Sequence, residues 1–375
     1  MKVLFFFLFK WIILYPKVIK GNVLTIPLST RFWNSLGFKV RFTKENDRDD
    51  YYFTLNTYLP FSLSRFDLNK IPQNTRRGKD IISLRDDYEM YLYIAEIEIS
   101  KQIKIDNLMA YNYDGNKYIL SWYSGLSFGY HYKNESFSII HYFYNTHQIE
   151  HKQFAIHRPS IDVGNLYIGG VPNNEHLSLP YKGVIQINEA LPTWGFTFKA
   201  IQYRNKEYKI DLPCIIITGL DKVFMSKEIF DIMKDKVFKE EIDNKTCNIS
   251  EYKQSLPYNY LYCNNSIHFK DIIEFVLSSN SFHFPINELF IEDVLDIQSY
   301  NENPINNFTG VIIGSKFINL FNYSLFDYDN NQIEFYSNTF PITIIANSTK
   351  LILAYLNITI CFCNGILLLF IQKLI

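Results

Sequence analysis

The chain of 375 residues lacks an excess of charge of either sign. Its 37 lysine and arginine residues balance 38 aspartate and glutamate residues, which leaves a net charge of −1. Nucleic acids are bound mainly by basic side chains that neutralise phosphates. The balanced charge therefore implies no nucleic-acid partner and no acidic surface as a partner.

The chain also lacks the short motifs that mark several common enzyme classes. It contains no Gly-x-Ser-x-Gly nucleophile elbow, no phosphate-binding glycine-rich loop and no His-Glu-x-x-His zinc motif. Its eight histidines are scattered, and no cysteine–histidine spacing indicates a metal site. We expect neither a cofactor nor a metal.

Cysteine is scarce, with five residues in the whole chain. Cys361 and Cys363 lie in an apolar C-terminal stretch, and Cys214 precedes an apolar run where a small core residue is expected. Cys247 and Cys263 bracket a polar segment, so they are the candidate disulfide of a secreted protein.

Apolar and aromatic residues are abundant. They make up 47% and 17% of the chain, which is ample for large cores and argues against disorder. A chain of this length exceeds the usual size of a single domain, so we expect about two domains.

Both ends are typical of proteins that enter the secretory pathway. Residues 1–22 combine a basic start with an apolar run, which predicts a signal peptide, with an uncleaved anchor as the alternative. Residues 351–372 form a mostly apolar tail, long enough for a transmembrane helix and followed by Lys373; a core helix or a lipid-anchor signal are the alternatives. We therefore expect an extracellular or cell-surface protein held by one membrane span.

The candidate glycosylation sites are Asn134, Asn244, Asn248, Asn264 and Asn307, and Asn322 and Asn347 also match the acceptor pattern.

Residues 310–336 have the pattern of an antiparallel β unit. Val311–Ile313 is a short apolar run closed by Gly314, which predicts a buried strand. After a short amphipathic link, Tyr323–Asp327 and residues 333–336 flank a turn at residues 329–331, where Asn and Asp tolerate left-handed backbone.

The order of these features resembles the C-terminal end of pepsin-like aspartic proteases. Residues 164–172, with sequence GNLYIGGVP, look like the strand and Gly-Gly turn that end the N-terminal lobe of that family. Residues 273–277 and 282–286 are similar to its late C-lobe strands. The resemblance covers roughly residues 50–340. It implies a mostly β, bilobal acid-protease fold with a central cleft.

The resemblance also implies domain boundaries. Residues 51–180 would be the N-terminal lobe and residues 181–341 the C-terminal lobe. Residues 23–50 resemble a shortened pro-segment or an N-terminal strand. Residues 226–236 have helical periodicity, with Ser226 as N-cap.

Catalysis in this family needs two aspartates on facing loops that share one proton, each within Asp-Thr-Gly or Asp-Ser-Gly. Neither motif occurs in the chain. In the C-lobe, Thr218 and Gly219 match the motif, but Ile217 stands at the aspartate position and cannot transfer a proton.

In the N-lobe, the spacing places Phe66 at the catalytic position, and a slip of one residue would place Asp67 there. The hairpin tip that covers the substrate in the family corresponds to residues 83–87. Leu84 there replaces the covering tyrosine, and Arg85 replaces a flexible glycine.

These substitutions predict a pepsin-fold protein without proteolytic activity, with a cleft that binds a peptide or protein ligand. We also expect a monomer. Two other functions stay open. One is an active aspartic endopeptidase that uses Asp67 and an unidentified partner. The other is a glycosylated structural or adhesive surface protein with a filled cleft.

Overall fold

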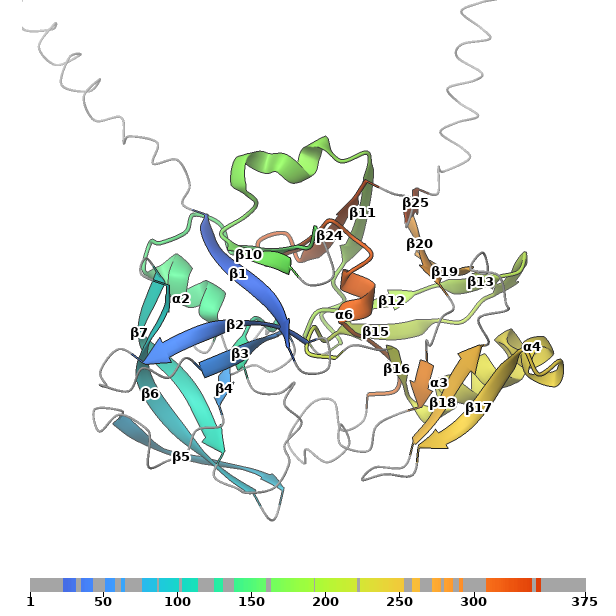
Figure 1. Ribbon diagram of the computed structural model, residues 1–375, viewed down its shortest axis with the longest axis horizontal. Helices are drawn as coiled ribbons and strands as arrows, with labels where there is room; N and C mark the ends of the chain where they lie inside the picture. Colours follow the sequence, from blue (N-terminus) through green and yellow to red (C-terminus); the bar gives the residue numbers. More distant parts are fainter. Residues whose placement is uncertain are drawn as a thin grey trace, which may run out of the picture.

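The computed structural model describes part of the chain, and the statements below concern that part (Figure 1). The described residues are 23–31, 35–42, 51–57, 62–64, 76–85, 88–100, 103–113, 125–130, 138–159, 163–191, 193–220, 223–252, 258–263, 272–277, 280–285, 290–292, 308–338 and 342–344.

A sheet of 13 strands runs through the molecule in the order β11-β24-β23-β9-β10-β1-β2-β3-β8-β4-β7-β6-β5. Its strands are β1 Leu24–Arg31, β2 Ser35–Phe42, β3 Tyr51–Asn56, β4 Ser62–Ser64, β5 Arg76–Arg85, β6 Tyr88–Ser100, β7 Ile103–Tyr113, β8 Gly125–Ser127, β9 Gln153–His157, β10 Val163–Ile168, β11 Tyr181–Gln186, β23 Tyr323–Asp327 and β24 Gln332–Ser337.

Two smaller sheets are built from the second half of the chain. A seven-stranded sheet contains β12 Gly195–Phe198, β15 Leu212–Ile216, β16 Val223–Met225, β17 Cys247–Tyr252, β18 Tyr258–Cys263, β21 Phe290–Glu292 and β22 Val311–Ile313. A five-stranded sheet contains β13 Ala200–Tyr203, β14 Lys206–Tyr208, β19 Ile272–Val276, β20 Asn280–Pro285 and β25 Ile342–Ile344.

Helices are short in the described part of the chain. They are α2 Ile139–Asn145, α3 Lys227–Ile232, α4 Lys239–Asp243, α6 Ser315–Ile318, the 3-10 segment η5 Pro172–Ser178 and the π-helical turn η6 Met233–Val237. The helical periodicity of residues 226–236 is confirmed by α3 and η6, with Ser226 at the N-cap.

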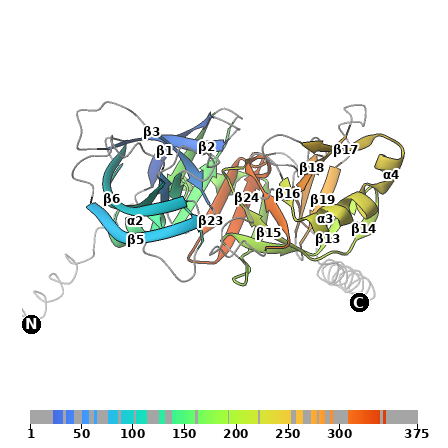
Figure 2. The same cartoon turned by 90° about the horizontal axis from the view of Figure 1, so that it is seen from below.

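The strands divide into two lobes joined by a shared sheet. Figure 2 shows the blue and cyan strands β1 to β6 at one end, and the yellow and orange elements β17, β18 and α4 at the other. β23 and β24 lie between them, where β23 pairs with β9 and β24 pairs with β11. The predicted mostly β, bilobal fold is confirmed.

The stretch 310–336 contains the predicted strands. β22 is buried, the link contains α6, and β23 pairs with β24 in a hairpin. Asp327 Oδ1 accepts hydrogen bonds from the backbone N–H groups of Asp329 (2.9 Å) and Asn330 (3.1 Å). This local capping fixes the turn that joins the two strands.

Aromatic side chains fill the core where the shared sheet meets the C-lobe. Trp194 is fully buried, and the rings of Phe154 and Phe326 stack with their centroids 4.5 Å apart. The Trp194 indole packs edge-on against Phe326 and donates a hydrogen bond to the Phe128 carbonyl at 2.8 Å. Buried aromatic area of this kind stabilises the junction of the lobes.

The predictions for the ends of the chain fall mostly on residues that the structure leaves undescribed. The signal peptide and the tail at residues 351–372 lie outside the described ranges. Within those ranges, no helix is long and apolar enough to cross a bilayer. Part of residues 23–50 forms β1 and β2 of the large sheet, with β1 paired to β10.

Candidate functional site

Two strand ends meet at the junction of the lobes. β3 runs parallel to β8, and β15 runs parallel to β22, so each lobe ends a buried strand beside a second, parallel strand. The residue after Asn56, where β3 ends, is Thr57. The second residue after Ile216, where β15 ends, is Thr218. These two threonines lie 161 positions apart in the chain and contact each other.

The two threonines form a hydrogen-bonded pair that we call the threonine clasp (Thr57 and Thr218). Both side chains are fully buried. The Thr57 hydroxyl donates to the Ile216 carbonyl and accepts from the Thr218 N–H, each at 3.0 Å. The Thr218 hydroxyl donates to the Leu55 carbonyl at 2.5 Å, and the two hydroxyl oxygens are 3.4 Å apart. Buried hydroxyls need such partners, so the clasp ties the strand ends of the two lobes together.

The clasp identifies which N-lobe residue is the counterpart of Ile217. Each hydroxyl bonds to the carbonyl of the residue two positions before the threonine on the opposite strand, Leu55 or Ile216. The residue between that carbonyl and the threonine is Ile217 in the C-lobe and Asn56 in the N-lobe. From this geometry we infer that Asn56 is the N-lobe counterpart of Ile217, whereas Phe66 and Asp67, the positions expected from the sequence, lie outside the described residues.

The C-lobe residues singled out from the sequence lie in one buried turn after β15. Ile217 is 1% exposed, and its N–H donates to the Ile313 carbonyl at 2.9 Å. Thr218 and Gly219 follow it in a buried turn, in which the Leu220 N–H bonds to the Ile217 carbonyl at 3.2 Å. The aliphatic side chain of Ile217 can neither hold nor release a proton.

The N-lobe half differs in polarity. Asn56 is the last residue of β3 and pairs in parallel register with Ser127. A carboxamide does not ionise in the pH range of acid catalysis, so a residue of this type cannot share a proton as a carboxyl group does. Neither position beside the clasp therefore carries the carboxyl group that the chemistry needs.

Thr193, which was not predicted as a site residue, is hydrogen-bonded to the backbone of the clasp. Its hydroxyl donates to the Thr57 carbonyl at 2.6 Å and accepts from the Tyr130 N–H at 3.2 Å. Its backbone is left-handed, with φ 49°, which is uncommon for a β-branched residue. The neighbouring Trp194 accepts a bond from the Ile216 N–H at 3.3 Å, so this short segment contacts both halves of the site.

The hairpin predicted to cover the cleft is present as β5 and β6. Arg85 pairs with Tyr88 next to the hairpin tip, and Leu84 precedes it on β5. The side chains of Leu84 and Arg85 are not among those the structure describes.

The disulfide candidates are joined in the structure. Cys247 and Cys263 lie opposite each other on β17 and β18 and form a disulfide. Cys214 is a free, fully buried thiol, and burial raises its pKa well above the ordinary value. In the described part of the chain, no group of three or more possible metal ligands occurs.

The glycosylation candidates differ in exposure. Asn244 is exposed, whereas Asn248 is half-buried. Asn322 is also half-buried, and its side-chain oxygen accepts a bond from the Asn338 N–H at 2.8 Å. Asn134, Asn264 and Asn307 lie outside the described residues.

A layer of histidine and tyrosine rings packs on the shared sheet at β9, β23 and β24, and no sequence pattern predicted it. His157 stacks on Tyr323 at 4.2 Å, and His176 packs edge-on against Tyr336 at 4.6 Å. Tyr323 donates a hydrogen bond to Glu175 at 3.1 Å. Burial lowers the pKa of both histidines, although the nearby carboxylates oppose this shift.

The chain is similar to known proteins in sequence pattern and in fold. The family model described as eukaryotic aspartyl protease matches residues 92–337. An aspartic proteinase from Irpex lacteus is similar in structure, with a TM-score of 0.62 at 11% identity over 85% of this chain and 98% of that chain. Basic 7S globulin from soybean is also similar, with a TM-score of 0.59 at 8% identity over 84% and 95%. A search of curated proteins found no match.

Proposed function

Because the chain belongs to the eukaryotic aspartyl protease family, we propose that it is a non-catalytic member whose interlobe region binds a peptide or protein ligand. The family reaction requires two carboxyl groups that share a proton, one acting as acid while the other acts as base. We therefore expect the chain to bind a ligand between its lobes without cleaving it.

The main support for the proposal is that the site keeps its structural hydrogen bonds but has no aspartate at the two positions beside them. The threonine clasp is present with its cross-lobe hydrogen bonds, so the site's scaffold is retained. The two positions that it aligns hold Asn56 and Ile217 instead of aspartate. The clasp ties the lobes together, whereas bond cleavage needs the carboxyl groups, so the first can persist without the second.

We propose further that the protein works in the secretory pathway or at the cell surface, tethered by residues 351–372. The apolar residues near the start of the chain support entry into that pathway. The Cys247–Cys263 disulfide supports an oxidising compartment, because disulfides are rare in the cytosol.

The structural comparisons are compatible with loss of activity. One similar structure is an aspartic proteinase, and the other is a globulin. At these low identities the likeness concerns the fold alone, so the substitutions at Asn56 and Ile217 remain the basis of the proposal.

The experiment combines a turnover assay with a binding assay on the full chain. A generic peptide library is incubated at acid pH, and products are followed by mass spectrometry, with a catalytically active pepsin-like proteinase as positive control. A pepstatin-type peptide is titrated by calorimetry in parallel. We expect saturable binding without cleavage.

The two assays separate the competing functions. Cleavage above background would overturn the non-catalytic assignment in favour of an active endopeptidase. Absence of both cleavage and binding would overturn the ligand-binding assignment in favour of a structural or adhesive role.

A further inference from the structure

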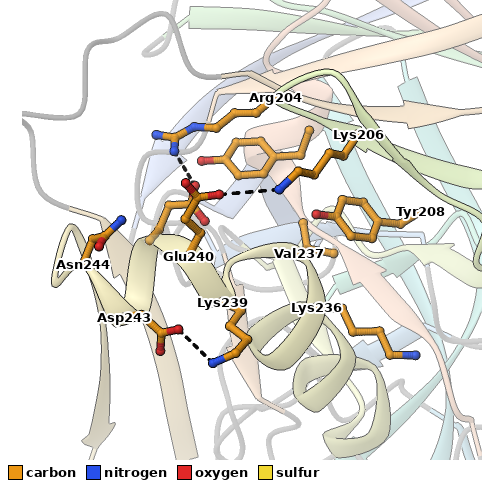
Figure 3. A pocket seen from close by; sticks show the side chains of 11 residues that line it. Arg204, Lys206, Tyr208, Lys236, Val237, Lys239, Glu240, Asp243 and Asn244 are labelled. Carbon is orange, nitrogen blue, oxygen red and sulfur yellow. Dashed lines mark hydrogen bonds and ion pairs between the residues drawn. The ribbon is translucent and has the colours of Figure 1, made fainter.

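A cavity of about 540 Å³ lies at the outer end of the C-lobe, and the proposed function does not use it. It lies between the β13–β14 hairpin and the segment formed by η6 and α4 (Figure 3). Its volume falls within the range of small-ligand sites, roughly 300–1,000 Å³. None of the residues that line it belongs to the threonine clasp.

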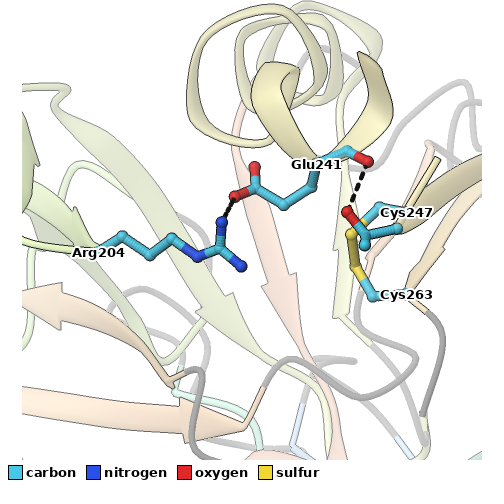
Figure 4. The surroundings of a disulfide bond; sticks show 5 residues. Arg204, Glu241, Cys247 and Cys263 are labelled. Atoms are coloured by element: carbon cyan, nitrogen blue, oxygen red, sulfur yellow. Dashed lines mark hydrogen bonds and ion pairs between the residues drawn. A yellow bond between two sulfur atoms is a disulfide. The ribbon is translucent and has the colours of Figure 1, made fainter. Parts of the chain in front are cut away.

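A buried carboxylate with one unused oxygen faces this cavity. Glu241 is 1% exposed, and its Oε1 forms an ion pair with Arg204 at 2.6 Å (Figure 4). Within the described residues, its Oε2 is buried without a hydrogen-bond partner. A buried hydrogen-bond acceptor without a donor destabilises the folded protein, so a ligand that donates a hydrogen bond to this oxygen would stabilise the fold.

The hairpin turn that positions Arg204 has left-handed backbone at both central residues. Arg204 and Asn205 both have positive φ, 47° and 63°, as in the tight turns that join two adjacent strands. The Arg204 guanidinium lies over the Tyr203 ring, 5.4 Å from its centroid. The turn therefore holds one wall of the cavity against α4.

The charges around the cavity nearly cancel. Four basic and three acidic side chains line it, and Lys206–Glu240 (3.5 Å) and Lys239–Asp243 (2.8 Å) are paired. This balance favours neither a phosphate-like anion nor a multivalent cation. A neutral ligand with many hydroxyl and amide groups could donate to the carboxylates and accept from the lysines, and the Tyr208 ring would provide an apolar face for its C–H groups. A saccharide has this chemistry.

An acceptor asparagine for such a saccharide stands at the edge of the same cavity. Asn244 lines it and begins the sequence Asn244-Lys245-Thr246. Figure 3 shows Asn244 at the end of α4, on the side of Glu240 and Arg204 and opposite Lys236 and Tyr208. The Thr246 hydroxyl donates to the Glu241 carbonyl at 2.9 Å, which couples the acceptor sequence to the buried carboxylate residue. Of the acceptor asparagines that the structure describes, Asn244 is the exposed one.

We propose that Asn244 carries an N-linked glycan and that the inner sugars of this glycan occupy the cavity. The donor is an oligosaccharide on a lipid diphosphate. The Asn244 amide nitrogen forms a bond to C1 of the first sugar and loses one proton, while the bond from C1 to the diphosphate oxygen breaks and the lipid diphosphate leaves. This inference rests on the passage through the secretory pathway that the proposed function includes.

The first test asks whether Asn244 is modified. The full chain is produced in a eukaryotic secretory host, with its own leader and in parallel with an added secretion signal, and its glycopeptides are mapped by mass spectrometry. We expect a glycan at Asn244 that Asn244→Gln removes, that Thr246→Ser retains and that the matched control Asn248→Gln leaves in place. An unmodified Asn244 in secreted protein would overturn the proposal.

The second test asks where the glycan lies. A tethered ligand has an effective concentration on the order of millimolar. For a sugar site of millimolar affinity, this should slow hydrogen–deuterium exchange of residues 203–208 and 236–244 by about two- to tenfold relative to Asn244→Gln. Tyr208→Ala should remove the protection in the glycosylated protein and change little in the Asn244→Gln background.

Equal exchange with and without the glycan would overturn occupancy of the cavity. Neither test measures peptide cleavage or binding. Failure of the glycan proposal is therefore distinguishable from failure of the non-catalytic assignment.

Discussion

The two lobes contribute equally to the threonine clasp but differ in what stands beside it. Thr57 and Thr218 each use their hydroxyl to bond the opposite strand end. Next to them, the N-lobe has the polar Asn56, and the C-lobe has the buried, aliphatic Ile217. The groups that hold the lobes together are thus retained on both sides, whereas the groups that would transfer protons are lost on both sides in different ways.

The lobes also differ in covalent reinforcement. All five cysteines lie at or after Cys214, so a disulfide within the N-lobe is impossible. The C-lobe carries the Cys247–Cys263 bond near its outer cavity. The junction of the lobes is therefore held by hydrogen bonds and buried aromatic rings, whereas the outer end of the C-lobe also has a cross-link and ion pairs.

The largest effect should come from restoring both proton carriers. The double variant Asn56→Asp with Ile217→Asp would place two carboxyl groups beside the clasp, where they can share a proton. We expect acid-dependent cleavage of a peptide library at least about 10²-fold above the wild-type background, the scale of general acid–base catalysis. Mass spectrometry of the products at acid and neutral pH measures it.

Each single variant serves as a control for this experiment. One carboxyl group cannot act as acid and base at the same moment, so neither Asn56→Asp nor Ile217→Asp alone should cleave. Asn56→Gln with Ile217→Leu controls for the disturbance of two substitutions. A folded double variant without activity would contradict the assignment of Asn56 as the counterpart of Ile217.

The C-lobe half of the site could be predicted from sequence because its local pattern is intact. An apolar strand runs into Thr218-Gly219, the helix at Ser226 follows, and the strands of residues 310–336 alternate clearly. These are local signals of turn chemistry and hydrophobic pattern, which determine structure within a few residues. The fold class could be predicted for the same reason.

The N-lobe half could not be predicted, because Tyr58 stands where the family motif has glycine. Without that glycine, residues 56–58 do not match Asp-Thr-Gly, and the sequence spacing indicates Phe66 or Asp67 instead. The decisive contact joins residues 161 positions apart, which no local pattern reports. A signal was nevertheless available: Phe53-x-Leu55-x-Thr57 has the same spacing of apolar residues and threonine as Cys214-x-Ile216-x-Thr218.

The next largest effect should follow from removing the cross-link of the C-lobe. The disulfide closes a loop with a sequence separation of 16, and a loop of that size predicts a loss of about 3 kcal/mol in unfolding free energy. Cys247→Ser with Cys263→Ser should show this loss in urea titration, and limited proteolysis should cut the C-lobe first. Cys214→Ala, which removes a buried thiol without a cross-link, should cost about 1 kcal/mol. Equal losses would mean that the disulfide adds no reinforcement.

Removing either hydroxyl of the clasp should cost about 2 kcal/mol, because Thr57→Val or Thr218→Val leaves buried carbonyl or N–H groups unpaired. The two losses should be similar if the lobes share the clasp equally. The double variant should cost less than their sum, because both residues serve one network. Thr57→Ser, which keeps the hydroxyl, is the matched control, and chemical denaturation of all four proteins measures the effects. Strict additivity would show that the two hydroxyls act independently.

The smallest effect should be a loss of stability in mild acid caused by the histidine layer between the lobes. Burial holds the pKa of His176 below 6.5, although Glu334 opposes the shift and Lys182 adds to it. The unfolded chain therefore binds a proton more readily, so stability is fully present above pH 6.5, falls below it, and levels off once the lowered pKa is passed.

The rings packed around His176 belong to Tyr336 and Tyr323, and the charges near them are Glu334, Lys182 and Glu175. His176→Phe keeps an aromatic ring against Tyr336 and removes the titration, so the slope of melting temperature against pH should become smaller. An unaltered slope in His176→Phe would show that this histidine does not weaken the junction in acid. A decreased slope would set the junction of this chain apart from a junction suited to catalysis at low pH, in agreement with the absence of a carboxyl pair beside the clasp.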